Sequence, residues 1–127
     1  LNPEKHIALG KSLAALREEN ILIIGSGLSF HNMGEFFSTD TTNNYKNVEF
    51  DNWLVETCSK ESMSPADREE RLIGWENAPH ARYCHPREEH FLPLHVCYGV
   101  ASRDTPKAEV VFNNEVLGKR VTGLLWR

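Results

Sequence analysis

The chain has 127 residues, a length typical of a single domain, with ordinary hydrophobic (40%) and charged (25%) fractions. Its 14 basic and 18 acidic residues give a net charge of -4, which argues against nucleic-acid binding, because phosphate recognition needs clustered lysine and arginine. The longest apolar run, Ile21 to Ile24, is too short to cross a membrane. Three cysteines form no CxxC pair and no even set, which is typical of reduced thiols. We expect a cytoplasmic protein with neither a nucleic-acid nor a membrane partner.

The start of the chain predicts a helix followed by a buried strand. Asn2 and Pro3 are typical of a helix N-terminus, and apolar residues at a period near 3.6 continue to Leu16. The run Ile21–Ile24 is short, rich in β-branched residues and apolar on both faces, as in the middle of a parallel sheet. The sequence therefore predicts an α/β fold, with part of a central, largely parallel sheet flanked by helices.

The rest of the chain predicts a surface loop, three helices and a C-terminal strand pair. The loop covers residues 33–47, which are rich in Thr, Asn and Gly. Helices are expected at about Phe50–Ser59, Ser64–Glu76 and Glu89–Ala101, with Pro93 tolerated in the first turn of the last one. Two β-rich runs, Ala108–Phe112 and Val121–Trp126, predict the strands.

The loop Gly25–Asn32, with the sequence Gly-Ser-Gly-Leu-Ser-Phe-His-Asn, follows the predicted strand. Ligands of such sheets gather beyond the carboxyl ends of the strands. Glycine permits unusual φ angles or close backbone approach, so the loop can direct Ser26, Ser29 and His31 into a crevice. An imidazole there can exchange protons near neutral pH or bind a metal. The alternative is that His31 only caps a turn.

Four histidines, His80, His85, His90 and His95, are spaced five residues apart. Five residues rotate a helix by roughly 500°, so successive members would lie about 140° apart and would not share a face. We interpret the regular spacing as a coincidence.

His90 differs from the other three because it lies at a predicted helix start, beside Glu88 and Glu89. It is either a metal ligand on a rigid element or an exposed first-turn histidine. The two carboxylates match what a site with two histidines and one carboxylate needs. They equally match the preference for acids at a helix N-terminus.

Together these motifs resemble the C-terminal half of the LigB-like class III extradiol ring-cleavage dioxygenases, and most of all their DOPA 4,5-dioxygenase branch. The resemblance covers most of the chain in order, from the opening helix to at least Ala101. It rests on the Gly25–Asn32 loop, on Phe50-Asp51 with Trp53-Leu54, on Ala78-Pro79, on His85–Leu94 and on Gly99-Val100-Ala101.

The resemblance implies a non-haem metal, usually Fe(II) and in some structures zinc, that binds a catechol and O₂ for ring opening. It implies that His31 is the active-site histidine, as an acid/base catalyst or a further metal neighbour, and that His90 binds the metal. Ser29 and His85 would lie on the substrate side, although the residue at the His85 position varies in the family.

Members of this family are much longer, and their other metal-binding histidines lie in an N-terminal half that this sequence lacks. His6 is the only histidine before His31, and it matches none of those ligands. We therefore expect residues 1–127 to form one domain, the C-terminal portion of an extradiol dioxygenase-like catalytic domain. Its metal site would be incomplete and its own activity little or none. Two hypotheses compete. One is a non-catalytic subunit that forms a homo-oligomer or pairs with a separate N-terminal chain. The other is a zinc hydrolase using His31 and His90, for which we find no nucleophile motif.

Overall fold

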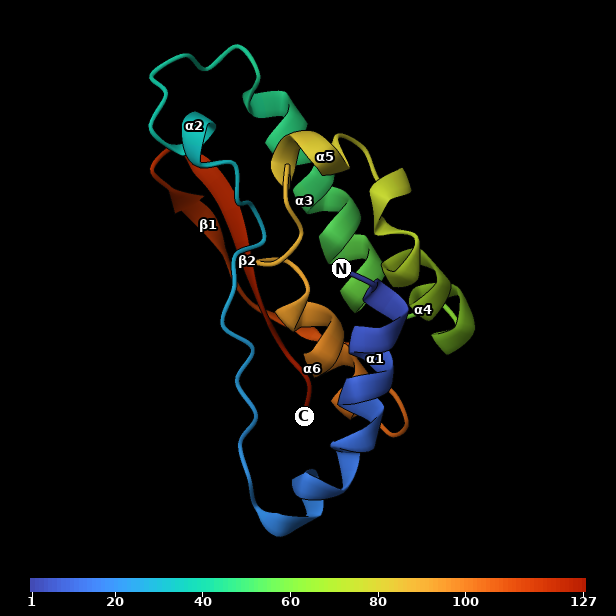
Figure 1. The fold of residues 1–127 in the computed structure, drawn as a ribbon. Coiled ribbons are helices and arrows are strands. Elements are labelled where there is room, and N and C mark those ends of the chain that lie inside the picture. The colour runs from blue at the N-terminus through green and yellow to red at the C-terminus, as the bar shows by residue number, and fades with distance from the viewer.

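The computed structural model describes all of residues 1–127 and combines helices with a single β-hairpin (Figure 1). The α-helices are α1 (Pro3–Ser12), α2 (Met33–Phe36), α3 (Asn44–Ser59), α4 (Pro65–Ile73), α5 (Ala81–Cys84) and α6 (Pro93–Ala101). Two 3-10 helices, η1 (Ala14–Glu19) and η2 (Trp75–Asn77), follow α1 and α4, and the strands are β1 (Glu109–Val116) and β2 (Lys119–Leu125). None of these helices has the length and apolar character needed to span a membrane.

Helix α1 begins as predicted and packs along α6 (Figure 1). The Asn2 side chain accepts a hydrogen bond from the Lys5 N–H at 2.8 Å, and Pro3 occupies the first turn. The two helices approach closely because Gly10 of α1 faces Gly99 of α6. A Cβ atom at Gly10 would lie 2.1 Å from the Val96 carbonyl oxygen. This contact fixes α6, and with it the chain just before α6.

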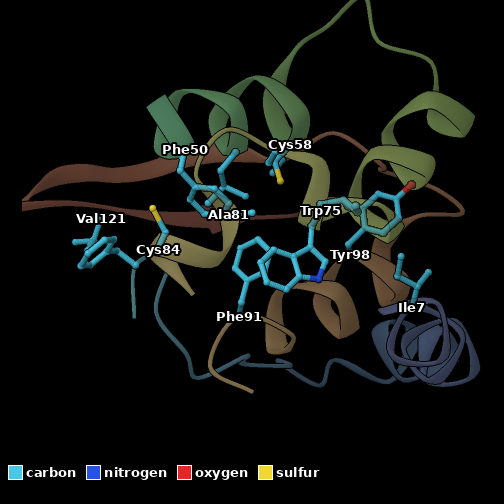
Figure 2. Close-up of a cluster of buried hydrophobic side chains, with 14 of the residues drawn as sticks. Ile7, Phe50, Cys58, Trp75, Ala81, Cys84, Phe91, Tyr98 and Val121 are labelled. Carbon is cyan, nitrogen blue, oxygen red and sulfur yellow. The ribbon is translucent and has the colours of Figure 1, made fainter. Parts of the chain in front are cut away.

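A cluster of aromatic side chains forms the centre of the core (Figure 2). The Phe91 ring lies 5.2 Å from the Trp75 ring and 5.6 Å from the Phe50 ring, between centroids, and all three residues are fully buried. Figure 2 shows Ile7 and Tyr98 toward one end of the cluster, and Val121 and Cys84 toward the other. Residues from α1, α3, α6 and β2 thus share one core.

The β-hairpin is fixed on α3 by buried polar contacts. Asp51, only 2% exposed, accepts hydrogen bonds from the Thr122 hydroxyl at 2.5 Å and from the Asn113 amide at 2.8 Å. Asn47 both donates to and accepts from the backbone of Arg120, at 2.9 and 2.7 Å. These bonds satisfy polar groups that burial would otherwise penalise. The predicted C-terminal strand pair is confirmed, as an antiparallel pair with a turn at residues 117–118.

The structure differs from the sequence prediction at three places. Ile21–Ile24, predicted as a strand, is extended without being a strand. The two strands that the structure shows are the antiparallel pair β1 and β2, so the parallel part of the predicted sheet stays a prediction. Helix α3 begins at Asn44, inside the predicted surface loop, and α2 interrupts that loop. Helix α6 begins at Pro93 rather than near His90, because Phe91 and Leu92 both donate backbone hydrogen bonds to Glu88 in a preceding turn.

Candidate functional site

The imidazole rings of His31 and His90 stack on each other. Their centroids are 3.8 Å apart and their planes differ by 15°. His31 lies in the loop before α2 and is half-buried, whereas His90 lies in the turn before α6 and is exposed. The structure thus brings together the two histidines to which the sequence assigned the most direct chemistry, although 59 positions separate them.

Hydrogen bonds join the two loops and hold the rings together. The Leu28 N–H donates to the His90 carbonyl at 2.9 Å, and the His31 N–H donates to the Cys84 carbonyl at 3.0 Å. The Asn32 amide donates to the Tyr83 carbonyl at 2.7 Å, and its oxygen accepts from the Glu35 N–H as the N-cap of α2. This anchoring role of Asn32 was not among the predictions from the sequence. The Asn-x-x-Glu spacing before a short helix was the available signal.

The glycines of the first loop serve close packing. A Cβ atom at Gly27 would lie 2.2 Å from the His90 carbonyl oxygen, and one at Gly25 would lie 2.5 Å from the Cys97 sulfur. Neither glycine has a positive φ. Of the two roles considered for these glycines, the structure therefore supports close backbone approach.

We predict that Gly27→Ala displaces the first loop from His90. The added methyl group overlaps a backbone oxygen, and overpacking of this kind costs about 1–3 kcal/mol of unfolding free energy. Because the charge of His90 helps to lower the pKa of His31, separation of the rings should move that pKa back toward 6.5. Urea unfolding and NMR titration of the imidazoles measure both effects. Gly34→Ala, where the nearest atom to an added Cβ would be 3.7 Å away, is the control. Unchanged stability and an unchanged His31 titration in Gly27→Ala would contradict the prediction.

The stacked geometry restricts what the histidine pair can bind. A metal lies close to the plane of an imidazole that binds it, at about 2.0–2.1 Å from the nitrogen. Two nearly parallel rings 3.8 Å apart cannot both place one ion in their planes. In this arrangement one ring can be a ligand while its neighbour exchanges protons. Burial and the nearby His90 lower the pKa of His31, which favours the neutral form that accepts a proton.

Ser29 and His85, predicted on the substrate side, lie next to each other but in different environments. Ser29 lines a cavity, and its hydroxyl accepts a hydrogen bond from the Thr122 N–H at 2.8 Å. His85 has no exposed surface, and its Nε2 atom lies 2.9 Å from the Ser29 carbonyl oxygen. Since a carbonyl only accepts hydrogen bonds, Nε2 carries the proton. The structure therefore places His85 behind Ser29, where it supports the loop and has no open path to a ligand.

The other histidines and the neighbouring acids are dispersed. His80 contacts Glu49 at the surface, and His95 is buried against the Leu72 carbonyl, so the five-residue spacing does not form a cluster. Glu88 is held by Arg82 at 2.8 Å, and hydrogen bonding to that guanidinium lowers the pKa of Glu88 to about 2. The structure contains no group of three or more His, Cys, Asp or Glu side chains arranged to hold a metal ion.

A cavity of about 410 Å³ opens beside the histidine pair. One wall is the extended segment 21–29, the opposite wall is the end of β2, and α6 lies between them. His90 contributes to the lining at one end, as does Ser29. Most of the lining residues are apolar, so the space favours an apolar occupant next to the polar histidine pair.

Comparison with known proteins gives this geometry a context. Residues 1–124 match the family model described as the catalytic LigB subunit of aromatic ring-opening dioxygenase. The chain is 35% identical over 115 residues to a 4,5-DOPA dioxygenase extradiol from Beta vulgaris, covering 90% of this chain and 40% of that protein. It is 32% identical over 134 residues to Dioxygenase tasH from Hapsidospora irregularis, covering 98% of this chain and 40% of that protein.

The fold has a counterpart among solved structures. The crystal structure of an uncharacterized protein from Escherichia coli K12 superposes with a TM-score of 0.68 at 22% identity, covering 98% of this chain and 49% of that one. This likeness concerns the fold alone. The chain spans about 40% of the length of the curated relatives described above. Because the family model matches nearly every residue, the chain belongs to the LigB family of aromatic ring-opening dioxygenases.

Proposed function

We propose that this chain carries the proton-exchanging histidine and one metal-binding histidine of an extradiol ring-cleaving dioxygenase. The substrates would be a catechol-type aromatic compound and O₂, at a non-haem metal. The observation that carries the proposal is the stacked His31–His90 pair beside an apolar cavity. Membership of the LigB family and relatives named 4,5-DOPA dioxygenase extradiol support the reaction class.

The two histidines would have different roles. His90 is exposed and available as a metal ligand, whereas the lowered pKa of His31 suits a base that takes a proton from a catechol hydroxyl and later returns it. Bound Fe(II), or zinc in the isolated protein, would supply Lewis acidity and hold the two substrates together. Assigning His31 as a second metal ligand would require its ring to turn away from the stacked orientation.

Ser29 and His85 complete the proposed site. Ser29 lines the cavity, and its hydroxyl, which accepts from the Thr122 N–H, still carries a proton that it could donate to a substrate. His85 would act through Ser29, as a positioning residue, because its hydrogen bond to the Ser29 carbonyl holds the loop that ends in His31. The buried ring of His85 lies within 6 Å of the rings of Phe50, Trp75 and Phe91, between centroids, so the core fixes this support rigidly.

The histidine pair fits one part of a metal site. Catalytic sites of this type have about three protein ligands, and here one ring of the stacked pair offers a free nitrogen to an ion. We propose that the other ligands come from further polypeptide of the kind that the longer relatives contain. The chain by itself should then show little or no turnover.

The test compares the chain alone with the chain joined to the part of the Beta vulgaris relative that lies outside the matched region. Each protein is loaded with Fe(II) without oxygen, and a catechol and then air are added. We expect a yellow ring-opened product from the joined protein only. His31→Gln should lower kcat by roughly 100- to 10,000-fold with little loss of bound iron, because it removes a proton acceptor. His90→Ala should lower the stoichiometry of bound iron as well as activity. Full turnover by either variant would contradict the assignment.

A second candidate is the non-catalytic subunit predicted from the sequence, which forms a homo-oligomer or pairs with a separate chain. The open apolar cavity and the exposed segment 21–24 favour it. Metal content separates the candidates. A joined or assembled protein that binds no stoichiometric iron and opens no ring would support the subunit hypothesis. For the cell compartment we propose the cytoplasm, since all three cysteines are free and two are buried.

A further inference from the structure

An extended segment without a partner strand forms one wall of the cavity. Residues 21–27 belong to no helix or strand, and none of their backbone N–H or carbonyl groups forms a backbone hydrogen bond. Leu22 and Ile24 are each 76% exposed. Figure 1 shows this segment, in blue, running along the length of the molecule beside β2. An apolar, β-branched segment left in this state is a template for strand pairing.

The opposite wall is a strand with one free edge. Strand β2 pairs with β1 on one side only. On its other side the N–H of Arg120 is taken by the Asn47 side chain and that of Thr122 by the Ser29 hydroxyl. Alternate residues of a strand present their N–H groups to the same side, so the N–H of Leu124 points toward the cavity. Side chains thus cover this edge as far as Thr122 and leave it open beyond.

The floor between the two walls is apolar and built from α6. Pro93, Leu94, Cys97, Val100 and Ala101 line it. The cavity thus has a backbone edge on each side and an apolar floor. This combination fits a β-strand with apolar side chains better than a small polar ligand, because a strand can pair its own N–H and carbonyl groups with both edges.

The comparisons indicate where such a strand comes from. The curated relatives and the solved structure contain about twice the polypeptide that this chain matches, or more. Residues 1–127 themselves have no further strand to place in the cavity. Leu22 and Ile24 also lie on one face of the extended segment, since side chains alternate, so an occupant must cover this face as well as fill the space.

We propose that the cavity between segment 21–27 and β2 is a docking site for an apolar β-strand. The strand belongs to the portion of LigB-family polypeptide that lies outside the matched region, and that portion also packs apolar residues over Leu22 and Ile24. The docked strand converts segment 21–27 and β2 into members of one sheet. The strand ends beside His90, so the added polypeptide lies next to the histidine pair, and the end of the cavity lined by Ser29 and His90 is left to the substrate. This docking goes beyond the proposed reaction and does not depend on it.

The experiment measures backbone hydrogen exchange of this chain, alone and together with the outside portion of the Beta vulgaris relative. The portion is supplied as a co-expressed separate chain and, in a second protein, joined covalently to this chain. Alternate amides of residues 21–27, those on the edge that faces the docked strand, and the amide of Leu124 should exchange at least about 100-fold more slowly in the assembled protein, because they become hydrogen-bonded in a sheet. The turn at residues 117–118 should be unaffected. A folded joined protein in which every amide of residues 21–27 exchanges as fast as in the chain alone would overturn the proposal.

Matched variants test the location of the docking surface. Leu22→Lys with Ile24→Lys places two charges on the proposed surface, and it should reduce co-purification of the separate portion by at least tenfold. Phe37→Lys, at a residue that is 72% exposed and outside the cavity, should leave co-purification unchanged. All three side chains are exposed, so the variants should fold, and circular dichroism checks this. Equal loss in both proteins, or no loss in either, would overturn the proposal.

Two further outcomes have distinct meanings. Self-association of the chain alone, with the same protection of residues 21–27, would identify a second copy as the occupant and overturn the proposed one. Ring opening is recorded separately on the joined protein. Protection without ring opening or iron binding would support the docking and contradict the proposed reaction. Ring opening with residues 21–27 unprotected would support the proposed reaction and contradict the docking.

Discussion

Gly99→Ala is expected to destabilise the chain by about 1–3 kcal/mol, although alanine normally stabilises a helix relative to glycine by roughly 0.5–1 kcal/mol. Gly99 lies in α6, where a Cβ atom would be 2.2 Å from the Ile7 carbonyl oxygen and 2.9 Å from the Gly10 Cα. Both are backbone atoms of α1, so no flexible side chain can move aside. The helices would have to separate, and the burial of Ile7, now 1% exposed, would be lost in part.

The same crossing predicts how two substitutions combine. Gly10→Ala alone should also destabilise, since its Cβ would meet the Val96 oxygen at 2.1 Å. Once one methyl group has separated the helices, the second has less to displace, so the double variant should lose less than the sum of the single losses. Urea unfolding measures all three differences. Gly34→Ala, whose Cβ would have no atom nearer than 3.7 Å, should change stability by only a few tenths of a kcal/mol. A Gly99→Ala protein as stable as the parent would contradict this account of the crossing.

Local sequence signals predicted the ends of several elements correctly. Asn2-Pro3 starts α1 and Ser64-Pro65 starts α4, with each cap side chain accepting a hydrogen bond from the backbone three residues later. The C-terminal runs form the predicted strand pair. These signals are local, because a cap or a β-rich run needs only its own neighbours in the sequence.

Features that are set by contacts between distant residues were predicted less well. The polar residues 44–47 suggested a loop, yet they open α3, because Asn47 is buried and pairs with the backbone of Arg120. The run Ile21–Ile24 has the composition of a buried strand but remains extended and exposed. A strand requires neighbours on at least one edge, and nothing within a short window of sequence reveals whether they are present.

The candidate site shows the same division. The family resemblance predicted that His31 and His90 lie in one site. The residue pattern by itself also allowed a His31 that only caps a turn and a His90 that is only an exposed first-turn histidine. The bonds that bring them together, from Leu28 to His90 and from His31 to Cys84, join backbone groups and have no side-chain signature in the sequence. The burial of His85 could not be predicted from its motif either, because its partners are the Ser29 carbonyl and aromatic rings from distant parts of the sequence.

Acidification is expected to unfold the chain through His85 and His95. Burial lowers the pKa of each to about 4, from an ordinary value of 6.5. Each ring already donates through Nε2 to a carbonyl oxygen, and each Nδ1 atom is buried with no hydrogen-bond partner. A second proton would therefore place a positive charge in the core next to the aromatic rings, and at His85 the added N–H would have no acceptor.

The pH range follows from these two pKa values. Between pH 6.5 and 4 the unfolded chain binds more protons than the folded chain, so stability rises with pH. The contribution is complete above about pH 6.5 and is lost as the pH falls toward 4. Each histidine accounts for up to about 3 kcal/mol, since one pKa unit corresponds to about 1.4 kcal/mol. Carboxylates with lowered pKa, such as Glu88, act in a separate range, below their ordinary value of 4.5.

Urea unfolding between pH 4 and 8 measures this dependence, and single variants assign it. His95→Gln keeps a donor for the Leu72 carbonyl but cannot take up a proton, so it should remove about one proton from the slope of stability against pH. The slope, and not the absolute stability, is the readout, so a general loss of packing in the variant does not obscure the result. His80→Gln, at a surface histidine, controls for loss of a histidine as such. Equal slopes in the parent and in His95→Gln would show that this buried ring does not set the acid limit. His85→Gln tests the other ring in the same way. Because His85 also supports Ser29, acid should loosen the loop that holds His31 at the pH at which the core unfolds.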